Sequence, residues 1–112
     1  MRLDTQLLKG TTPLLVLAVI ADGEFYGYEI AQHIRERSGG AFAPSEGSLY
    51  PALHRLEADG ALSATWRASD RGPRRRYYRL TARGRGLLAE NRDRFDAFIS
   101  GVRGVTSGAI DA

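Results

Sequence analysis

The spacing of apolar residues along the chain predicts three helices, a hairpin and a final helix, in that order. Residues 13–21 are almost all apolar, and Asp22-Gly23 ends the run. Because proline suits the first turn of a helix, a buried helix is expected to begin near Pro13. An earlier helical pattern starts at Leu7 and Leu8 and is interrupted before this proline.

A second helix is expected from about Gly27 to Ser38. Ile30, Ala31 and Ile34 share one face at helical spacing, and the opposite face is charged. Two consecutive glycines at 39 and 40 close the segment. This is the pattern of an amphipathic surface helix.

A third helix follows a short linker and carries leucines at positions 49, 53 and 56 on its buried face. Ser45, after Pro44, and Ser48 are both suitable caps for its start. Pro51 complicates that start, because a proline inside a helix removes a hydrogen-bond donor and strains the preceding turn. Either the helix begins late with Ser48 as its cap, or its first turn is distorted; Asp59-Gly60 ends it.

Residues 62–67 alternate apolar and polar positions, as in a half-buried strand, and residues 76–80 return with aromatic residues that favour strands. Asp70, Gly72 and Pro73 supply turn chemistry between them. A helix, a short turn, a helix and a hairpin make a mostly α fold with a small β-hairpin (α+β). This is the arrangement of a winged helix-turn-helix.

The final helix is expected to begin after Thr81, a good N-cap. Residues that step alternately by three and four have the spacing of a coiled-coil seam. They are apolar except for Asn91, which interrupts the stripe: Leu88, Asn91, Phe95, Phe98, Val102 and Val105. The partner of this seam is expected to be the same helix of a second copy, which predicts a homodimer. The alternative is that this face packs back on its own domain. Glycines at 101, 104 and 108 weaken the helix and predict an early end.

Charge is distributed unevenly along the chain. The formal net charge is +3, but residues 40–85 hold nine arginines against four acidic residues. Arginine suits phosphate groups and guanine edges better than lysine does, because its planar guanidinium donates two parallel hydrogen bonds. The middle of the chain is therefore expected to meet an anionic partner, although a merely solvated basic surface is the alternative.

Two segments carry this chemistry. With the leucines inward, the third helix turns Gly47, Tyr50, Pro51, His54 and Arg55 outward, where they can enter a DNA groove. The hairpin tip carries Arg71, Arg74, Arg75 and Arg76. Such close like charges repel one another and serve no folding need, so a phosphate backbone or a minor groove is the expected partner.

Other classes of function are not supported. The chain has no cysteine, which removes disulfides and thiolate metal sites. His33 and His54 stand alone, without a metalloprotease, nucleophile-elbow or P-loop motif, so neither catalysis nor a metal nor a cofactor is expected. The apolar run before Asp22 is too short to span a membrane and Met1-Arg2-Leu3 does not open a signal peptide, so a soluble cytoplasmic protein is expected.

Several motifs in order resemble the PadR family of bacterial transcriptional regulators. They are Gly27-Tyr28-Glu29-Ile30, the run from Ser48 to Leu53, Arg55-Leu56-Glu57 before Gly60, and the run from Gly72 to Thr81. The resemblance covers most of the chain. It implies a third helix that reads the major groove, a wing on phosphate or minor groove, a C-terminal dimerisation helix, and repression that a small molecule releases in some members. The short C-terminal region resembles the subclass with a single dimerisation helix.

The sequence therefore predicts a DNA-binding repressor, with residues 1–80 as the winged helix-turn-helix domain and residues 81–112 as the dimerisation helix and tail. The expected partners are a near-palindromic double-stranded operator, a second copy and a small hydrophobic or aromatic effector. Family members often have a tryptophan three residues before a phenylalanine in the last helix. In this sequence Phe95 takes the position of the tryptophan and Phe98 that of the phenylalanine. The sequence therefore gives less support to a flat aromatic effector bound in a tryptophan-lined pocket. A winged helix for protein interaction and an RNA-binding basic domain are the rival functions.

The predicted DNA-binding residues form one set, and the predicted dimer and effector residues form another. The first set is Tyr28, Ser45, Gly47, Ser48, Tyr50, Pro51, His54, Arg55, Arg74, Arg75 and Arg76. The second set is Leu88, Asn91, Phe95, Phe98 and Val102.

Overall fold

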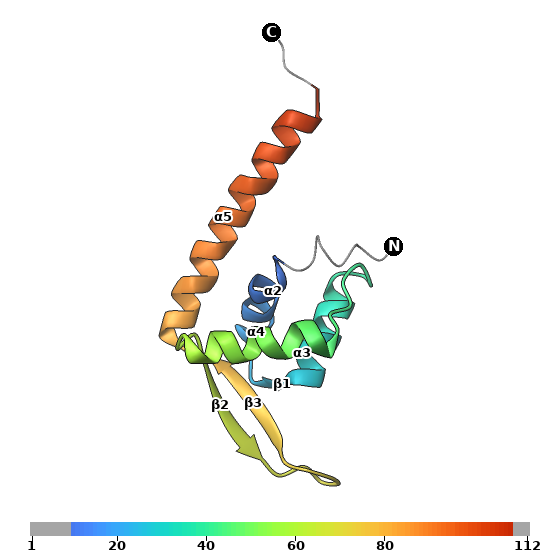
Figure 1. The fold of residues 1–112 in the computed structure, drawn as a ribbon, viewed down its shortest axis with the longest axis vertical. Coiled ribbons are helices and arrows are strands. Elements are labelled where there is room, and N and C mark those ends of the chain that lie inside the picture. Colours follow the sequence, from blue (N-terminus) through green and yellow to red (C-terminus); the bar gives the residue numbers. More distant parts are fainter. Residues whose placement is uncertain (1–9, 109–112) are drawn as a thin grey trace.

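The computed structural model describes residues 10–108, so the helical pattern predicted at Leu7 and Leu8 lies outside the described residues. Figure 1 shows a small helical domain from which a hairpin and a long helix project in opposite directions. The elements in chain order are α2 (Thr12–Ile20), β1 (Phe25–Tyr26), α3 (Gly27–Arg37), α4 (Glu46–Ala58), β2 (Leu62–Arg67), β3 (Arg75–Leu80) and α5 (Ala82–Thr106).

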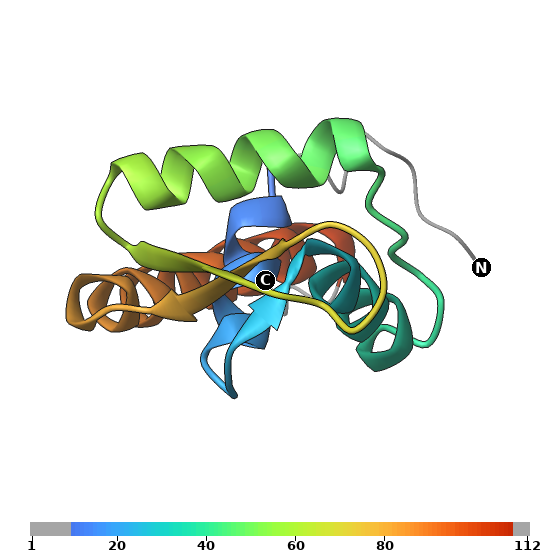
Figure 2. The same cartoon turned by 90° about the horizontal axis from the view of Figure 1, so that it is seen from below.

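Helix α2 lies at the centre of the core, as its nearly continuous apolar sequence predicts. Val16, Leu17 and Ile20 are almost fully buried, and the helix contacts α3, α4, α5 and β3. Figure 2 shows α2 enclosed by these elements, with α4 along one edge of the domain. Burial of each such side chain contributes about 1.5–3 kcal/mol, so α2 holds the other helices in place.

The sheet has three strands in the order β1-β3-β2, all antiparallel. Leu62 pairs with Leu80 at the base of the hairpin, where both side chains are buried in the core. Trp66 pairs with Arg76 nearer to the tip of the hairpin. The two-residue strand β1 was not predicted, because two residues are too few to show an alternating pattern.

Helix α4 begins at Glu46, which decides between the two caps left open by the sequence. Ser45 is the N-cap, and its Oγ accepts a hydrogen bond from the Ser48 amide at 3.3 Å. Pro51 lies inside the helix and cannot donate to the Gly47 carbonyl one turn earlier. The late start at Ser48 is therefore wrong.

Helix α5 has 25 residues, which corresponds to about 37 Å. Thr81 caps it, because its Oγ1 accepts a hydrogen bond from the Gly84 amide at 3.0 Å. The helix continues through Gly101 and Gly104 to Thr106, so the early end expected from these glycines is wrong. Within residues 10–108 no helix combines the length and the apolar character needed to cross a membrane.

Candidate nucleic-acid interface

One face of α4 is exposed and polar. Leu49, Ala52, Leu53 and Leu56 are buried against the domain, whereas the five residues predicted to face outward are all exposed. These five are Gly47, Tyr50, Pro51, His54 and Arg55. The leucine spacing therefore predicted correctly which side of the helix is free.

The start of α4 offers backbone donors at this exposed face. Ser45 and Glu46 are exposed and Ser48 is half-buried. The Ser48 hydroxyl donates to the Ser45 carbonyl at 3.1 Å, so this side chain is partly engaged within the turn. Amides in the first turn of a helix lack intrahelical acceptors and attract anions, which makes this end of α4 suited to a phosphate.

Tyr50 is positioned by a glycine of the preceding helix. Its ring lies so close to Gly27 that a Cβ on the glycine would come within 2.7 Å of the Tyr50 hydroxyl. Tyr50 still exposes 39% of its surface, and Tyr28 exposes 62%. Both predicted tyrosines thus lie at the surface near the start of α3 and the first turns of α4.

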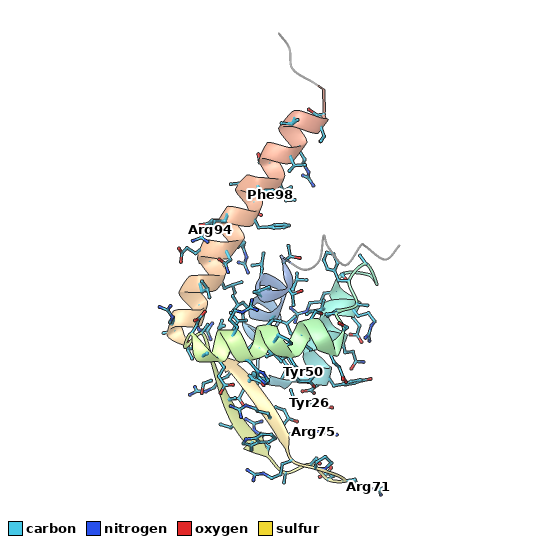
Figure 3. The ribbon with its side chains drawn as sticks, in the orientation of Figure 1. Tyr26, Tyr50, Arg71, Arg75, Arg94 and Phe98 are labelled. Carbon is cyan, nitrogen blue, oxygen red and sulfur yellow. The ribbon has the colours of Figure 1, made fainter. Side chains whose placement is uncertain are left out.

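The arginines at the hairpin tip are exposed and partly ordered by aromatic rings. The Arg75 guanidinium lies 4.5 Å from the centre of the Tyr26 ring, and Arg74 lies 5.8 Å from that of Trp66. Figure 3 shows Tyr50 and Tyr26 between α4 and the hairpin, with Arg75 and then Arg71 further along it. Arginines stacked on rings keep their N–H groups available while losing fewer conformations on binding.

Two other hairpin arginines have partners within the fold. Arg76 forms an ion pair with Glu57 of α4, and Arg67 forms one with Glu24. The expectation that the hairpin arginines serve no folding need is therefore wrong for Arg76. The sequence did contain a signal, because antiparallel pairing from the base of the hairpin places Arg76 opposite Trp66 and on the side that faces the domain.

Tyr78, two residues after Arg76 on β3, is 2% exposed. Burial raises the pKa of the Tyr78 phenol above its usual value of 10.0, and the nearby Arg76 guanidinium opposes the change by favouring the phenolate. A neutral phenol is therefore the form that the domain holds at physiological pH.

The apolar stripe of α5 divides into a covered part and an exposed part. Leu88 is 7% exposed and belongs to the core of its own domain, so the stripe does not begin there as the spacing predicted. Phe95 is 36% exposed, Phe98 65% and Val102 41%. Val105 is 80% exposed. Packing on its own domain, the alternative weighed for this face, is therefore observed for Leu88.

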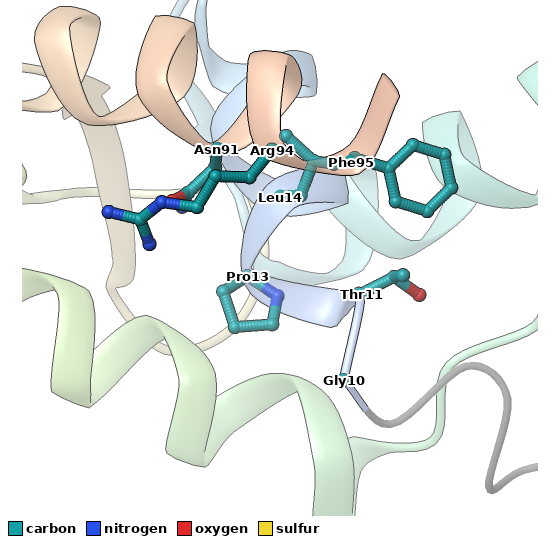
Figure 4. A pocket seen from close by; sticks show the side chains of 7 residues that line it. All are labelled: Gly10, Thr11, Pro13, Leu14, Asn91, Arg94 and Phe95. Carbon is teal, nitrogen blue, oxygen red and sulfur yellow. The ribbon is translucent and has the colours of Figure 1, made fainter. Parts of the chain in front are cut away.

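A hollow of about 330 Å³ lies between α5 and the start of α2. Figure 4 shows Asn91, Arg94 and Phe95 of α5 on one side and Pro13 and Thr11 on the other. Gly10 and Leu14 complete its lining. Two of the residues predicted for the dimer or effector site, Asn91 and Phe95, therefore lie beside a cavity.

Comparison with known proteins shows to which family the chain belongs. The family described as PadR-like transcriptional regulators matches residues 16–90. The chain belongs to the PadR family. It is a transcriptional regulator of that family rather than an enzyme.

Individual relatives agree with this assignment. Transcriptional regulator Rv3488 of Mycobacterium tuberculosis is 46% identical over 79 residues, which is 70% of each chain. The crystal structure of a PadR family transcription regulator from Clostridium difficile is 32% identical, with a TM-score of 0.72 over 88% of this chain and all of that one. A transcriptional regulator from Clostridium thermocellum shares the fold with a TM-score of 0.84 over 93% and 98% of the two chains, at 24% identity.

The predicted DNA-binding residues of this PadR-family regulator lie on α4 and at its cap, at the start of α3 and on the hairpin. Sequence reasoning missed Glu57, Glu24 and Trp66, which hold arginines of the hairpin. Among the described residues no three histidine, aspartate or glutamate side chains gather as metal ligands would.

Proposed function

We propose that the protein is a homodimeric repressor that binds a near-palindromic duplex operator in the cytoplasm and leaves it when a small apolar or aromatic effector binds. The observation that carries this proposal is the exposed polar face of α4 beside an arginine-rich hairpin tip. Two such units separated by about 34 Å would read successive major grooves.

Within this proposal α4 reads bases and the hairpin tip holds the backbone. Tyr50, His54 and Arg55 are exposed on the outer face of α4 and can donate or accept hydrogen bonds at base edges. Arg71, Arg74 and Arg75 are exposed on the hairpin and suit phosphates or a narrow minor groove. Phosphate contacts set the register, and base contacts set the sequence.

The exposed part of the α5 stripe supports a dimer. Phe98, Val102 and Val105 leave an apolar face in water, and a second copy would cover all three in a self-complementary contact. The division at residue 80 into a DNA-binding domain and a dimerisation helix stays part of this proposal.

The hollow beside α5 supports the effector part of the proposal. Its walls include Pro13, Leu14 and Phe95, with polar groups from Asn91 and Arg94. Its volume is at the lower end of the range of about 300–1,000 Å³ found for small-molecule sites. A screen of aromatic compounds for release of bound DNA tests this part.

The main experiment is selection of bound fragments from genomic DNA with purified protein, followed by affinity measurements over a salt series. For Arg74→Ala/Arg75→Ala we expect weaker binding to every DNA sequence and a log-log salt slope reduced by about 0.9 for each lost contact. Arg92→Ala, which removes an exposed arginine of α5, is the control and should keep the wild-type slope.

Two results would contradict the proposal. Binding that is weak and indifferent to salt would favour a winged helix for protein interaction, and competition by structured RNA stronger than by duplex DNA would favour an RNA-binding domain. An unchanged slope in the double variant would remove the hairpin tip from the interface.

A further inference from the structure

A polar cluster joins the hairpin to the underside of α4. Glu57 near the end of α4 pairs with Arg76 of β3, and both side chains are about one-third exposed, at 29% and 34%. The same guanidinium lies 5.5 Å from the centre of the Trp66 ring. Arg76 thus connects a residue of α4 with a residue on the neighbouring strand.

Arg76 differs from the other arginines near the tip. Its Nε is buried and has no hydrogen-bond partner among the described residues, whereas Arg74 and Arg75 are exposed. In residues 10–108 neither of these two forms a salt bridge. Arg76 is therefore directed into the fold while its neighbours are left for a partner.

The ion pair lies where it can restrain the part of the hairpin that extends beyond the core. At the base, Leu62 and Leu80 hold the strands in the core, but Trp66 is already 53% exposed. Within the described part of the chain, the Glu57–Arg76 pair is the one salt bridge between α4 and the hairpin. The buried Tyr78 lies two residues from Arg76 on β3, and the charges of both Arg76 and Glu57 act on its phenol.

We infer that Glu57 and Arg76 are positioning residues that fix the hairpin against α4, so that Arg71, Arg74 and Arg75 meet the DNA backbone while α4 occupies its groove. This inference rests on the proposed function. It replaces the sequence-based expectation that Arg76 itself contacts DNA. A pair in this role needs no contact with the nucleic acid.

Because Glu57 is negatively charged, its removal can either strengthen or weaken DNA binding, and the direction of the change tests the inference. Removal of a carboxylate beside DNA should strengthen binding if only the electrostatic attraction changes. Removal of a positioning carboxylate should weaken binding to the specific sequence. Glu57→Gln keeps the size of the side chain and therefore separates the two effects.

The experiment uses full-length wild type, Glu57→Gln, Arg76→Gln and the double variant. The probes are a duplex recovered by selection with the wild-type protein and a scrambled duplex of the same length and composition. For both single variants we expect affinity for the selected duplex to fall by about tenfold, the scale of coupling between residues of one network. The salt slope should stay at the wild-type value, and the double variant should be no weaker than either single one.

Arg75→Gln is the matched control, because it removes an exposed arginine next in sequence and should reduce the salt slope. Far-UV circular dichroism verifies that each variant is folded. Trp66 fluorescence gives an independent readout, since Glu57→Gln should disturb Arg76, whose guanidinium lies 5.5 Å from the centre of the Trp66 ring.

Two outcomes overturn the inference in distinguishable ways. Tighter binding by Glu57→Gln, with a salt slope lowered by about 0.9 in Arg76→Gln, would identify Arg76 as a phosphate contact. Failure of the wild-type protein to prefer any duplex would remove the proposed function itself, and the inference with it.

Discussion

The two longest described helices, α4 and α5, differ in what covers their apolar faces. In α4, with 13 residues, Leu49, Ala52, Leu53 and Leu56 are all buried by the same chain. In α5, with 25 residues, burial is limited to Gly84 and Leu88. The apolar face of α4 is therefore covered within the domain and its free face is polar. Helix α5, in contrast, leaves an apolar stripe of Phe95, Phe98, Val102 and Val105 exposed.

This difference separates the roles of the two helices. A polar face is well hydrated, so its exposure to water gives no driving force for association. An exposed apolar stripe does give one, because its burial against another apolar surface is favourable. The comparison predicts that changes on α4 alter DNA binding in a folded protein, while changes on the far half of α5 alter assembly first.

Among the variants considered, Phe98→Arg is expected to have the largest effect, on both dimerisation and operator affinity. It tests whether the exposed apolar stripe of α5 serves assembly. Two charges would face each other across the two-fold axis of the proposed dimer, where burial of charge is costly. We expect a monomer in sedimentation at micromolar concentration and a loss of operator affinity on the order of a thousandfold, down to the level of non-specific DNA. A monomeric wild type that still binds an operator tightly would contradict this account of α5.

Leu88→Ala tests the division within α5. Because Leu88 belongs to the core, we expect the free energy of unfolding to fall by about 2–5 kcal/mol at every protein concentration. Val105→Ala, at an exposed position of the same stripe, is the comparison; it should leave the domain intact and weaken only the dimer. Urea unfolding at two protein concentrations measures both, and equal effects from the two variants would contradict the division.

Gly27→Ala tests the polar face of α4 without a substitution in that helix. The new methyl group displaces the Tyr50 ring, which can move because it is partly exposed. We expect a normal fold, unchanged affinity for random DNA and a loss of about 1–3 kcal/mol on the operator, the scale of one base contact. Gly86→Ala, where a Cβ meets nothing within 4 Å, is the control; similar losses in both variants would remove Tyr50 from sequence readout.

The smallest effect concerns Tyr78 at high pH. Because its pKa is raised in the folded state, the stability it contributes is present below pH 10 and is lost as pH rises through the raised value. Stability of the wild type should therefore fall more steeply above pH 10 than that of Tyr78→Phe. Urea unfolding at pH 7 and above pH 10 checks this, with Tyr28→Phe at an exposed ring expected to follow the wild type.

Sequence alone was sufficient for the described helices, for strands β2 and β3 and for the free face of α4, but not for β1. The leucines at 49, 53 and 56 fixed that face, and the strand 62–67 was predicted with its observed bounds, because both depend on local periodicity. The cap at Ser45 could not be decided, since Pro51 made two starts equally reasonable.

The rest depended on contacts between residues far apart in the chain. Alternation along β3 puts Arg76 on the same face as the buried Tyr78 and Leu80. No local pattern shows that its partner is Glu57, because that pair joins a helix and a strand. Likewise, heptad spacing cannot show that Leu88 meets the core while Phe98 does not, because both satisfy the same period. These features follow from tertiary packing.

The junction at Thr81 has a geometric consequence for operator choice. A single residue joins β3 to α5; its hydroxyl lies 2.6 Å from the Gly60 carbonyl oxygen, and a Cβ at Gly84 would collide with the Ala61 carbonyl. These contacts hold the first turn of α5 in place, so a small change in the tilt of this turn is amplified at the far end of the helix. A tilt of about 5° at this turn moves the far end of a helix of about 37 Å by about 3 Å, close to the rise of one base pair of about 3.4 Å. In the proposed dimer, the stiffness of residues 81–84 would therefore set the spacer length tolerated between half-sites.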